Sequence, residues 1–365
     1  MIKILLINTV PTEKNGITNV MFNYLRAMNN QGITIDLVSL NKPDDFYMQQ
    51  IERKGGKVYV IPRLEGVIRY WTSLHKLIRN NQYNIVHIHG NSHTTVLELT
   101  AARAAGCVVR MVHAHNTTCT HVVVHRLLTP LFNALCTHGL ACGEAAGKFM
   151  FGNKSFTVVN NGVDTDKFAF RADIRESVRK MYGLEGTKVI GHVGYFSEVK
   201  NHRWIIEVFR SLLENDKDFR LLLIGDGALR GEIENQAREY GIFDRITFTG
   251  NINNVDEVLN AMDIVLMPSL FEGLPLTLIE QQANGLQCVC SDTITKEADK
   301  TGTLRFISLN KSAKEWASEI ISFINIADRN KRSIESIKKI KKAGYSIQEE
   351  ADKLADLYMR LSKRI

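Results

Sequence analysis

Hydrophobic residues in this chain gather in short runs, which alternate with longer stretches in which apolar residues recur every three or four positions. A short apolar run bounded by turn residues predicts a buried strand, and the longer period predicts a helix with one buried face. The runs predicted as strands are 2–8, 33–39, 57–61, 84–89, 108–113, 156–160, 188–193, 219–224, 246–250, 263–268 and 288–292. Strands and helices that alternate in this way indicate an α/β fold, in which helices cover both faces of a parallel sheet.

The length of the chain indicates two domains, because 365 residues exceed what one hydrophobic core usually supports. We expect a first domain over residues 1–168 and a second over residues 186–345. The charged stretch 166–185 is expected to link them. The last stretch, 346–365, places its apolar residues on one stripe and is predicted to be an amphipathic helix.

The composition is that of a globular protein, with 44% hydrophobic and 23% charged residues. No run approaches the roughly 18 apolar residues of a membrane-spanning helix, and the first apolar run is too short for a signal peptide, so we expect a cytoplasmic protein. Six irregularly spaced cysteines are expected to be reduced thiols.

The net charge of +7 favours an acidic partner. Because the basic residues are scattered and form no nucleic-acid-binding motif, we expect a phosphorylated substrate or an anionic membrane surface rather than nucleic acid.

The segment 268–280 concentrates the candidate chemistry. It follows a predicted buried strand and leads into a predicted helix, whose first free N–H groups belong to Leu276 and Thr277. The helix dipole and these N–H groups favour a bound anion such as a phosphate. Glu272 precedes the anion site and Glu280 follows it, and a carboxylate can accept hydrogen bonds from sugar hydroxyls. A nucleotide-diphospho-sugar has the shape that fits this arrangement.

The pattern Glu-Gly-Leu-Pro-Leu-x-Leu-x-Glu of residues 272–280 resembles the donor motif of retaining glycosyltransferases of the GT-B fold, in the group that includes capsular and exopolysaccharide transferases. The resemblance implies two Rossmann-like, doubly wound parallel-sheet domains facing a cleft, with the acceptor bound by the first and the nucleotide-sugar by the second. It also implies that the last helix returns to the first domain. In this motif Glu272 would hold the transferred sugar and Glu280 the ribose. The other donor-binding residues that it implies here are Gly273, Leu274, Leu276 and Thr277.

Segments of the first domain resemble the same family. Gly16 follows the first strand where the family usually carries two glycines, and it would let the donor phosphate approach closely; a tight turn that needs a positive φ is the alternative. The strand end Val112-His-Ala-His-Asn116 resembles the one that carries a sugar-contacting histidine, for which His115 is expected and His113 is the alternate.

Segments of the second domain extend the resemblance. The family carries an arginine after a glycine and a lysine five or six residues later, both directed at the diphosphate. Lys200 matches the lysine, whereas Tyr195 replaces the arginine and offers one neutral hydroxyl instead of a charged guanidinium group with several N–H donors. Gly225 and Gly227 resemble the glycine turn beneath the nucleotide, and the stretch that begins at Asn251 is expected to face the nucleobase.

Two patterns raise the question of a metal site. Eight of the eleven histidines lie between His87 and His138, and His87 and His89 share one face of a predicted strand. No cysteine or carboxylate completes a familiar zinc set, so we expect these histidines to line the ligand cleft. Asp164 and Asp166 have the spacing of metal-binding aspartates in the other major transferase fold, but they follow an Asn-Gly turn where GT-B chains commonly carry such a pair. No metal or other cofactor is expected.

Two further stretches have the composition of interfacial helices. Residues 66–82 mix basic and aromatic residues with apolar ones, and residues 122–140 are largely apolar. An amphipathic helix packed on a sheet has a similar composition, and this is the interpretation we favour for 122–140. For 66–82, both interpretations stay open.

The resemblance therefore implies a metal-independent, retaining transferase that moves a hexose from a nucleotide-diphosphate sugar, with UDP the expected nucleotide, to a hydroxyl of a glycan or lipid-linked acceptor. Glu272, His115 and Lys200 would form its catalytic set. Peripheral contact with an anionic membrane would place it at the inner face of the plasma membrane. Two alternatives stay open: a nucleotide-sugar epimerase of the same architecture, and a sugar-nucleotide-binding protein without turnover, for which Tyr195 and the single Gly16 are the motivating features.

Overall fold

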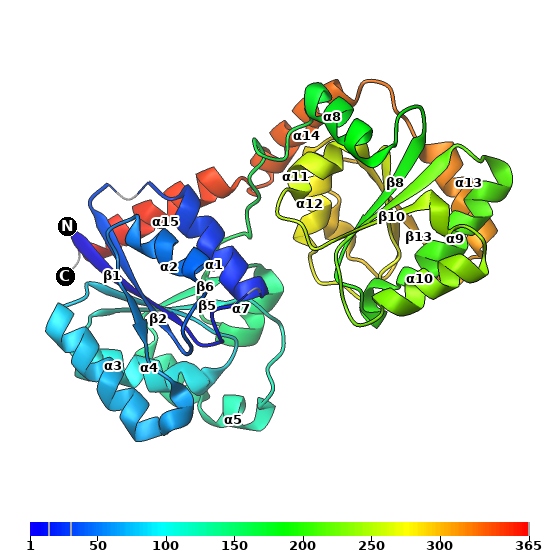
Figure 1. Ribbon diagram of the computed structural model, residues 1–365. Coiled ribbons are helices and arrows are strands. Elements are labelled where there is room, and N and C mark those ends of the chain that lie inside the picture. The colour runs from blue at the N-terminus through cyan, green and yellow to red at the C-terminus, as the bar shows by residue number, and fades with distance from the viewer. Residues whose placement is uncertain (14, 30, 364–365) are drawn as a thin grey trace. The chain divides into compact units, whose positions relative to one another are not determined.

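The computed structural model describes residues 1–13, 15–29 and 31–363. They form two compact units, one built from residues 1–162 together with the stretch from 344 onward, and the other from residues 163–343. Each unit contains one parallel sheet with helices packed on it (Figure 1). The prediction of two Rossmann-like, parallel-sheet domains is confirmed.

The strands of the first unit are β1 (Ile2–Asn8), β2 (Ile33–Ser39), β3 (Val58–Val60), β4 (Ile85–His89), β5 (Val109–Ala114), β6 (His138–Ala141) and β7 (Thr157–Val158). All pair in parallel, in the order β3-β2-β1-β4-β5-β6-β7. The order reverses between β1 and β4. This reversal is the topological switch point of a doubly wound sheet, outside which such folds bind their ligands.

The helices of the first unit are α1 (Gly16–Ala27), α2 (Asp45–Glu52), α3 (Val67–Asn81), α4 (Val96–Ala104), α5 (Val122–Leu127), α6 (Thr129–Leu135), α7 (Glu144–Phe151) and α15 (Ile347–Ser362). Helix α3 packs on α4 and buries Tyr70, Leu74 and Ile78 in the core. The open question about residues 66–82 is thus answered in favour of a packed amphipathic helix, although its first turn leaves Val67 and Ile68 exposed.

The stretch 122–140 departs from the expectation of one amphipathic helix. It forms two short helices, α5 and α6, and then enters β6. Pro130 lies in the first turn of α6, where a missing N–H costs nothing, but proline cannot continue a helix that arrives from the N-terminal side. Cys136 then adopts an extended backbone, and the chain pairs with β5. Most apolar residues of this stretch lie in α5 and α6, where Phe132 and Leu135 are buried while Val123 and Leu127 are exposed.

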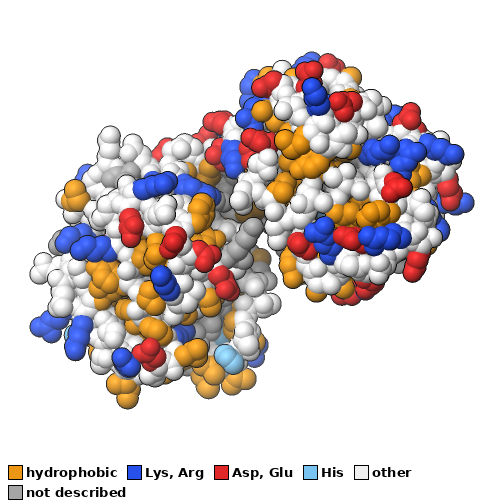
Figure 2. All heavy atoms as spheres, viewed as in Figure 1, with side chains coloured by type: hydrophobic (Ala, Val, Ile, Leu, Met, Phe, Trp, Pro, Cys, Tyr) orange, Lys and Arg blue, Asp and Glu red, His pale blue; other side chains and the backbone are white. Residues whose placement is uncertain are grey.

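Charged side chains are interspersed over the surface. On the face shown in Figure 2, lysine and arginine side chains lie beside aspartate and glutamate side chains on both units. Ion pairs between exposed side chains include Arg69 with Glu65 and Lys314 with Glu214. The net charge of +7 is therefore not gathered into one basic field on this face. In the described residues, no helix is long and apolar enough to span a membrane.

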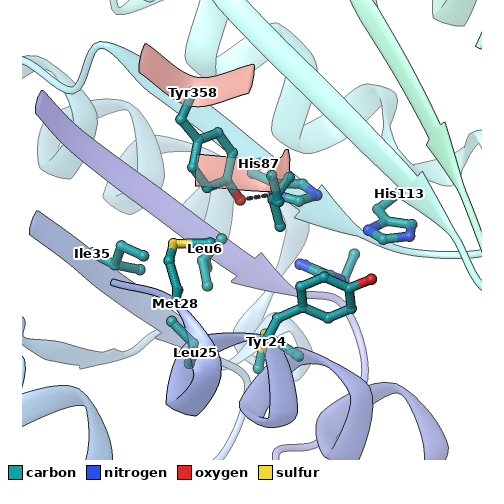
Figure 3. Close-up of a pocket in the computed structure, with 11 residues that line it drawn as sticks. Leu6, Tyr24, Leu25, Met28, Ile35, His87, His113 and Tyr358 are labelled. Atoms are coloured by element: carbon teal, nitrogen blue, oxygen red, sulfur yellow. Dashed lines mark hydrogen bonds between the residues drawn. The ribbon is translucent and has the colours of Figure 1, made fainter. Parts of the chain in front are cut away.

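Helix α15 supplies part of the core of the first unit. It packs against α1, and its Tyr358 is buried beneath the sheet. The hydroxyl of Tyr358 lies 2.6 Å from Nδ1 of His87 on β4, as the dashed line in Figure 3 shows. Gln348 of the same helix donates a hydrogen bond to the carbonyl of Ala27. The last helix is thus fixed to the first unit by both apolar and polar contacts.

The strands of the second unit are β8 (Lys188–Val193), β9 (Phe219–Ile224), β10 (Ile246–Gly250), β11 (Ile264–Met267), β12 (Gln287–Ser291) and β13 (Leu304–Ile307). They too are parallel, in the order β10-β9-β8-β11-β12-β13, with the switch point between β8 and β11. The helices are α8 (Ala172–Tyr182), α9 (His202–Asn215), α10 (Arg230–Glu239), α11 (Val255–Val258), α12 (Leu276–Ala283), α13 (Ala313–Phe323) and α14 (Arg329–Lys342).

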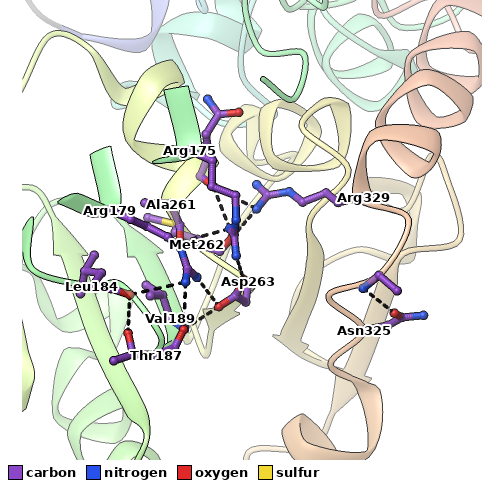
Figure 4. A network of polar contacts seen from close by, with 12 residues as sticks. Arg175, Arg179, Leu184, Thr187, Val189, Ala261, Met262, Asp263, Asn325 and Arg329 are labelled. Atoms are coloured by element: carbon purple, nitrogen blue, oxygen red, sulfur yellow. Dashed lines mark hydrogen bonds and ion pairs between the residues drawn. The ribbon is translucent and has the colours of Figure 1, made fainter. Parts of the chain in front are cut away.

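The charged stretch 166–185 is a correction to the expected linker, because it forms α8 and packs on the second unit. Its Arg175 and Arg179 form ion pairs with the buried carboxylate of Asp263, which precedes β11 (Figure 4). Arg179 Nη2 lies 2.6 Å from Asp263 Oδ2, and the same oxygen accepts a hydrogen bond of 2.8 Å from the backbone N–H of Val189. Two charged residues of this stretch, Arg175 and Arg179, therefore belong to a buried network that fixes α8 to the second unit.

We expect Asp263→Ala to destabilise the second unit by about 3–5 kcal/mol, because the substitution leaves the guanidinium groups of Arg175 and Arg179 without their anion. Urea unfolding followed by the fluorescence of Trp204 and Trp316 measures this effect.

Glu214→Ala is the matched control, since Glu214 pairs with Lys314 on the surface of the same unit and exposed pairs contribute at most about 1 kcal/mol. If Asp263→Ala costs no more than Glu214→Ala, the network does not hold α8 in place.

Candidate functional site

The candidate site lies at the switch point of the second unit. The loops that leave the carboxyl ends of β8 and β11 flank this point, one carrying Lys200 and the other Glu272. Lys200 Nζ lies 2.5 Å from Glu272 Oε1, with both side chains largely buried. The backbone N–H of Leu270 donates to the carbonyl of Val199, which ties the two loops together. Two residues that the sequence predicted for the diphosphate and the sugar are thus brought into contact across 72 positions of the chain.

Glycines allow the β9 loop to lie directly against the β8 loop. A Cβ atom on Gly225 would stand 2.1 Å from the carbonyl oxygen of Gly194, and one on Gly227 would stand 2.6 Å from that of Phe196. Gly225 also has a φ of +132°, which side-chain-bearing residues rarely adopt. The immediate reason for both glycines is therefore close backbone packing. Asn251, which follows the edge strand β10, is exposed.

The start of α12 is arranged as the sequence predicted. Pro275 is its N-cap residue, and Leu276 and Thr277 are the first helical residues. Within the described residues, no side chain caps this end, and its first turn contains no acidic residue. Gly273, in the loop before it, is exposed, while Leu274 is partly buried against the core. The N–H groups of this turn therefore form a positive end that can attract an anion.

Glu280 lies one turn further along α12. Burial raises the pKa of its carboxyl to about 7; nearby Lys167 lowers this pKa and Asp256 raises it. Lys167 Nζ is itself 3.2 Å from Asp256 Oδ1. Glu280 is half-buried, so it can face a ligand while its charged form remains poorly solvated. Its protonation therefore changes near neutral pH.

Two arginines near the loops of the site, Arg203 in α9 and Arg230 at the start of α10, are not free to replace the arginine that the family carries at the position of Tyr195. Tyr195 is 61% exposed, so its hydroxyl is not fixed by packing. Arg203 is paired with Glu232 and, at 2.6 Å, with Glu198. Arg230 is held by Glu234 at 2.9 Å and by Asp226 at 3.3 Å. The structure thus assigns both arginines to ion pairs within the protein.

Sequence reasoning missed two histidines beside Lys200. His192 on β8 is buried, and its Nδ1 lies 2.8 Å from the carbonyl oxygen of Leu266. His202 begins α9 and is also buried, and burial lowers its pKa to about 2. The two rings meet edge to face, 4.7 Å apart. A histidine within a predicted strand and another at a predicted helix start were the available signals, but neither belongs to a motif.

In the first unit, Gly16 is the first residue of α1, and Asn15 caps that helix by accepting a hydrogen bond of 3.0 Å from the N–H of Thr18. Gly16 is not among the described glycines with a positive φ, so the tight-turn alternative is wrong. A Cβ atom on Gly16 would meet no described atom within 4 Å. The space beside this helix end is therefore open to a ligand.

His115 and His113 differ in access. His115 follows the end of β5 and is half-buried, whereas His113 is only 1% exposed. The Nε2 atom of His115 lies 2.9 Å from Nδ1 of His89, and its backbone N–H donates to Asn91. Burial lowers the pKa of His115 to about 4, so its ring is neutral at pH 7 and can exchange hydrogen bonds with a hydroxyl. Access to a ligand thus favours His115 over His113.

Comparisons with known proteins agree over both units. The profile of glycosyl transferases group 1 matches residues 174–340, and that of glycosyltransferase family 4 matches residues 14–167. The EpsF protein of Bacillus subtilis (strain 168), itself named as a glycosyltransferase, is 32% identical over 95% of this chain and 94% of its own length. The Escherichia coli UDP-Gal:alpha-D-GlcNAc-diphosphoundecaprenol alpha-1,3-galactosyltransferase is 31% identical over 79% of this chain and 78% of that protein. Among solved structures, Anabaena Alr3699/HepE in complex with UDP shares the fold, with a TM-score of 0.79 at 15% identity over 98% of this chain and 100% of that chain.

The pKa of Glu280 predicts a specific pH dependence of stability. The pKa of the Glu280 carboxyl is about 7 in the folded protein and near 4.5 in the unfolded chain. Between pH 4.5 and about 7 the carboxyl is therefore protonated in the folded protein and ionised in the unfolded chain. This group therefore lowers stability as pH rises from about 4.5 to about 7 and changes nothing further above that range. Glu280→Gln removes the effect, so its Tm relative to the parent protein should rise between pH 5 and about 7.5.

Thermal unfolding at a series of pH values measures this difference, with Glu335→Gln on the exposed face of α14 as the control. A difference in Tm that stays constant from pH 5 to about 7.5 for Glu280→Gln would contradict the raised pKa.

Proposed function

This chain belongs to the group 1 glycosyltransferases of GT-B fold, and on that premise we propose that it is a retaining enzyme that transfers a hexose from a UDP-sugar to a hydroxyl of a lipid-linked or polysaccharide acceptor. The observation that carries the proposal is the contact between Lys200 and Glu272 at the switch point, beside the open helix start at Leu276. In this proposal one small site contains the cation of Lys200, a helix start that can bind an anion, and the carboxylate of Glu272, which can accept hydrogen bonds from sugar hydroxyls.

Each group has a role in this proposal. The N–H groups of Leu276 and Thr277, together with Lys200, stabilise the charge that grows on the leaving diphosphate. Glu280 accepts hydrogen bonds from the ribose, and Glu272 from the transferred sugar. His115 of the first unit is a second sugar contact. The leaving phosphate takes the acceptor proton on the same face of the sugar, so no protein carboxylate acts as nucleophile.

The Lys200–Glu272 ion pair has a consequence for donor binding. In the protein alone these two charges satisfy each other. A bound donor has to draw Lys200 toward the diphosphate and Glu272 toward the sugar hydroxyls. Part of the donor's binding energy is therefore used to separate the pair, and only a donor that carries both a diphosphate and a sugar replaces both partners.

We further propose that transfer needs no metal ion at the diphosphate. The start of α12 and Lys200 supply positive potential there. The aspartates of the Asp164-Thr-Asp166 pattern have local partners: Asp164 accepts a hydrogen bond from the N–H of Lys167, and Asp166 pairs with Lys341 at 3.2 Å.

Peripheral membrane contact at the inner face of the plasma membrane is part of the proposal. The relative from Escherichia coli is named for a diphosphoundecaprenol-linked acceptor, which resides in a membrane. The net charge of +7 favours approach to anionic lipid.

A non-catalytic nucleotide-sugar-binding protein is the second candidate. It is favoured by Tyr195 in place of arginine and by the ion pairs that occupy Arg203 and Arg230. The epimerase alternative is not favoured, because both domain profiles and the named relatives are those of glycosyltransferases.

The decisive assay incubates the protein with a panel of UDP-hexoses and a diphosphoundecaprenol-linked sugar in EDTA, and it follows the glycolipid by mass spectrometry and its anomeric configuration by NMR. We expect an elongated glycolipid with the donor's configuration retained. Glu272→Gln should lower turnover by about 100-fold or more, the scale of a lost transition-state contact, without weakening UDP binding. Epimerised UDP-sugar would indicate the epimerase, and binding without any product would indicate the non-catalytic protein.

Tyr195→Arg tests the departure from the family pattern. The new guanidinium should tighten UDP binding by about 1–2 kcal/mol, the scale of one charge-assisted hydrogen bond. Titration calorimetry measures it, and Met181→Arg on the exposed side of α8 controls for added charge alone. Equal affinities for the parent and Tyr195→Arg proteins would show that another group already serves the diphosphate.

A further inference from the structure

Four histidines gather at the carboxyl ends of β4 and β5. His87 and His89 are two positions apart on β4, so their side chains share one face of the sheet. The register of the parallel pair places His113 directly beside His89, and His115 follows two residues later. Their rings stack at centroid distances of 4.3–5.6 Å. Strand pairing thus converts two His-x-His motifs into one cluster.

The rings of His87, His89 and His113 lie close enough together to be considered as ligands of one ion. One nitrogen each from His87, His89 and His113 lies within 4.8 Å of the other two. The side chains are 0%, 4% and 1% exposed, respectively. A Zn–N distance of about 2.0–2.1 Å in a tetrahedral site requires N···N distances of about 3.3 Å, so a bound ion has to draw the three rings closer together.

Two of the three rings contain nitrogens that lack partners in the described part of the chain. Over the described residues, His87 Nε2 and both ring nitrogens of His113 are buried without a hydrogen bond. An unpaired buried polar atom costs about 1–3 kcal/mol, which makes three in one cluster a feature that needs an explanation. Figure 3 shows His87 and His113 at a cavity that also holds Tyr24 and Tyr358, and its volume of about 10 Å³ suits a single water-sized or ionic occupant.

Two of the three histidines have partners of the kind that orient metal-binding histidines, whereas neither ring nitrogen of His113 has one among the described residues. His87 Nδ1 is 2.6 Å from the Tyr358 hydroxyl, and His89 Nδ1 is 2.9 Å from His115 Nε2. In metal sites, such outer contacts fix the ring orientation and leave the other nitrogen directed at the ion.

Other histidine groups in the chain differ in this respect. His93 stacks on His125, but its Nδ1 meets the His125 carbonyl and its Nε2 meets the Met150 carbonyl. The pair His192 and His202 brings together two rings, one fewer than a three-histidine site needs. In the described residues, the set on β4 and β5 is the one in which three ligand atoms converge.

We propose that His87, His89 and His113 bind one late first-row divalent cation such as Zn²⁺. Imidazole ligands suit this class of metal, and three histidines leave a fourth position for water, hydroxide or an anionic ligand group. The set contains no carboxylate, so a hydroxide or other monoanion in the fourth position would offset one of the two positive charges of the buried cation.

The proposed metal ligands belong to the first unit, whereas Lys200 and Glu272 belong to the second. The effect of this metal site on the proposed sugar contact would be one of positioning. A bound ion fixes the ring of His89, and His89 holds His115 through their hydrogen bond. The inference does not depend on which sugar is transferred.

The test uses the full chain with any affinity tag removed, incubated with Zn²⁺, gel-filtered, and analysed for metal content. We expect about one equivalent of zinc per chain, and a Tm that rises with added Zn²⁺ by mass action. His87→Ala/His113→Ala should abolish both effects, whereas His121→Ala, at the exposed start of α5, should retain them.

Because the double variant can perturb the buried core, X-ray absorption on the parent protein gives an independent readout. We expect imidazole scattering and Zn–N distances of about 2.0–2.1 Å. The proposal is overturned if the parent protein retains no zinc, if a folded double variant retains as much as the parent, or if bound zinc shows no imidazole ligands. A cavity filled by water alone would give the first of these results.

Discussion

The site depends on the reversal of strand order between β8 and β11. Two parallel strands that are followed by helices on opposite faces of the sheet must send their loops apart, which opens a crevice at their carboxyl ends. In the second unit, α9 buries Ile205 with Leu221 on one face, and α12 buries Leu278 with Leu222 on the other. The loop before α9 carries Lys200 and the loop before α12 carries Glu272. Their contact follows from the topology, because each loop can leave the sheet only on its own side.

Rigid neighbours make this crevice a defined site. The β9 loop fits against the β8 loop because Gly225 and Gly227 lack side chains at the points of contact. The buried carboxylate of Asp263 ties α8 to Val189 in β8, the strand that pairs with β11. A buried ion pair of this kind fixes geometry more surely than it adds stability. The positions of Lys200 and Glu272 are therefore set by packing on both sides of the sheet.

Much of this could be predicted from the sequence, where the local signal was unambiguous. Strands such as 2–8 and 188–193 are short apolar runs, and the start of α12 is marked by Pro275. Strand β13 was missed because Arg305 interrupts a short edge segment. The start of β6 was predicted as helix because a short run of apolar residues shows neither the strand period nor the helix period. The pairing of Lys200 with Glu272 and the convergence of His87, His89 and His113 depend on strand order and register, which no local pattern specifies.

Helix α15 determines the order in which this chain can fold during synthesis. The second unit is one continuous stretch, 163–343, so all of it is synthesised before α15. Until α15 has been synthesised, the first unit lacks Tyr358 and its contact with His87. Domains usually fold in the order in which they are translated. Here the first unit is completed only after the second has been synthesised, because residues 347–362 supply its last helix.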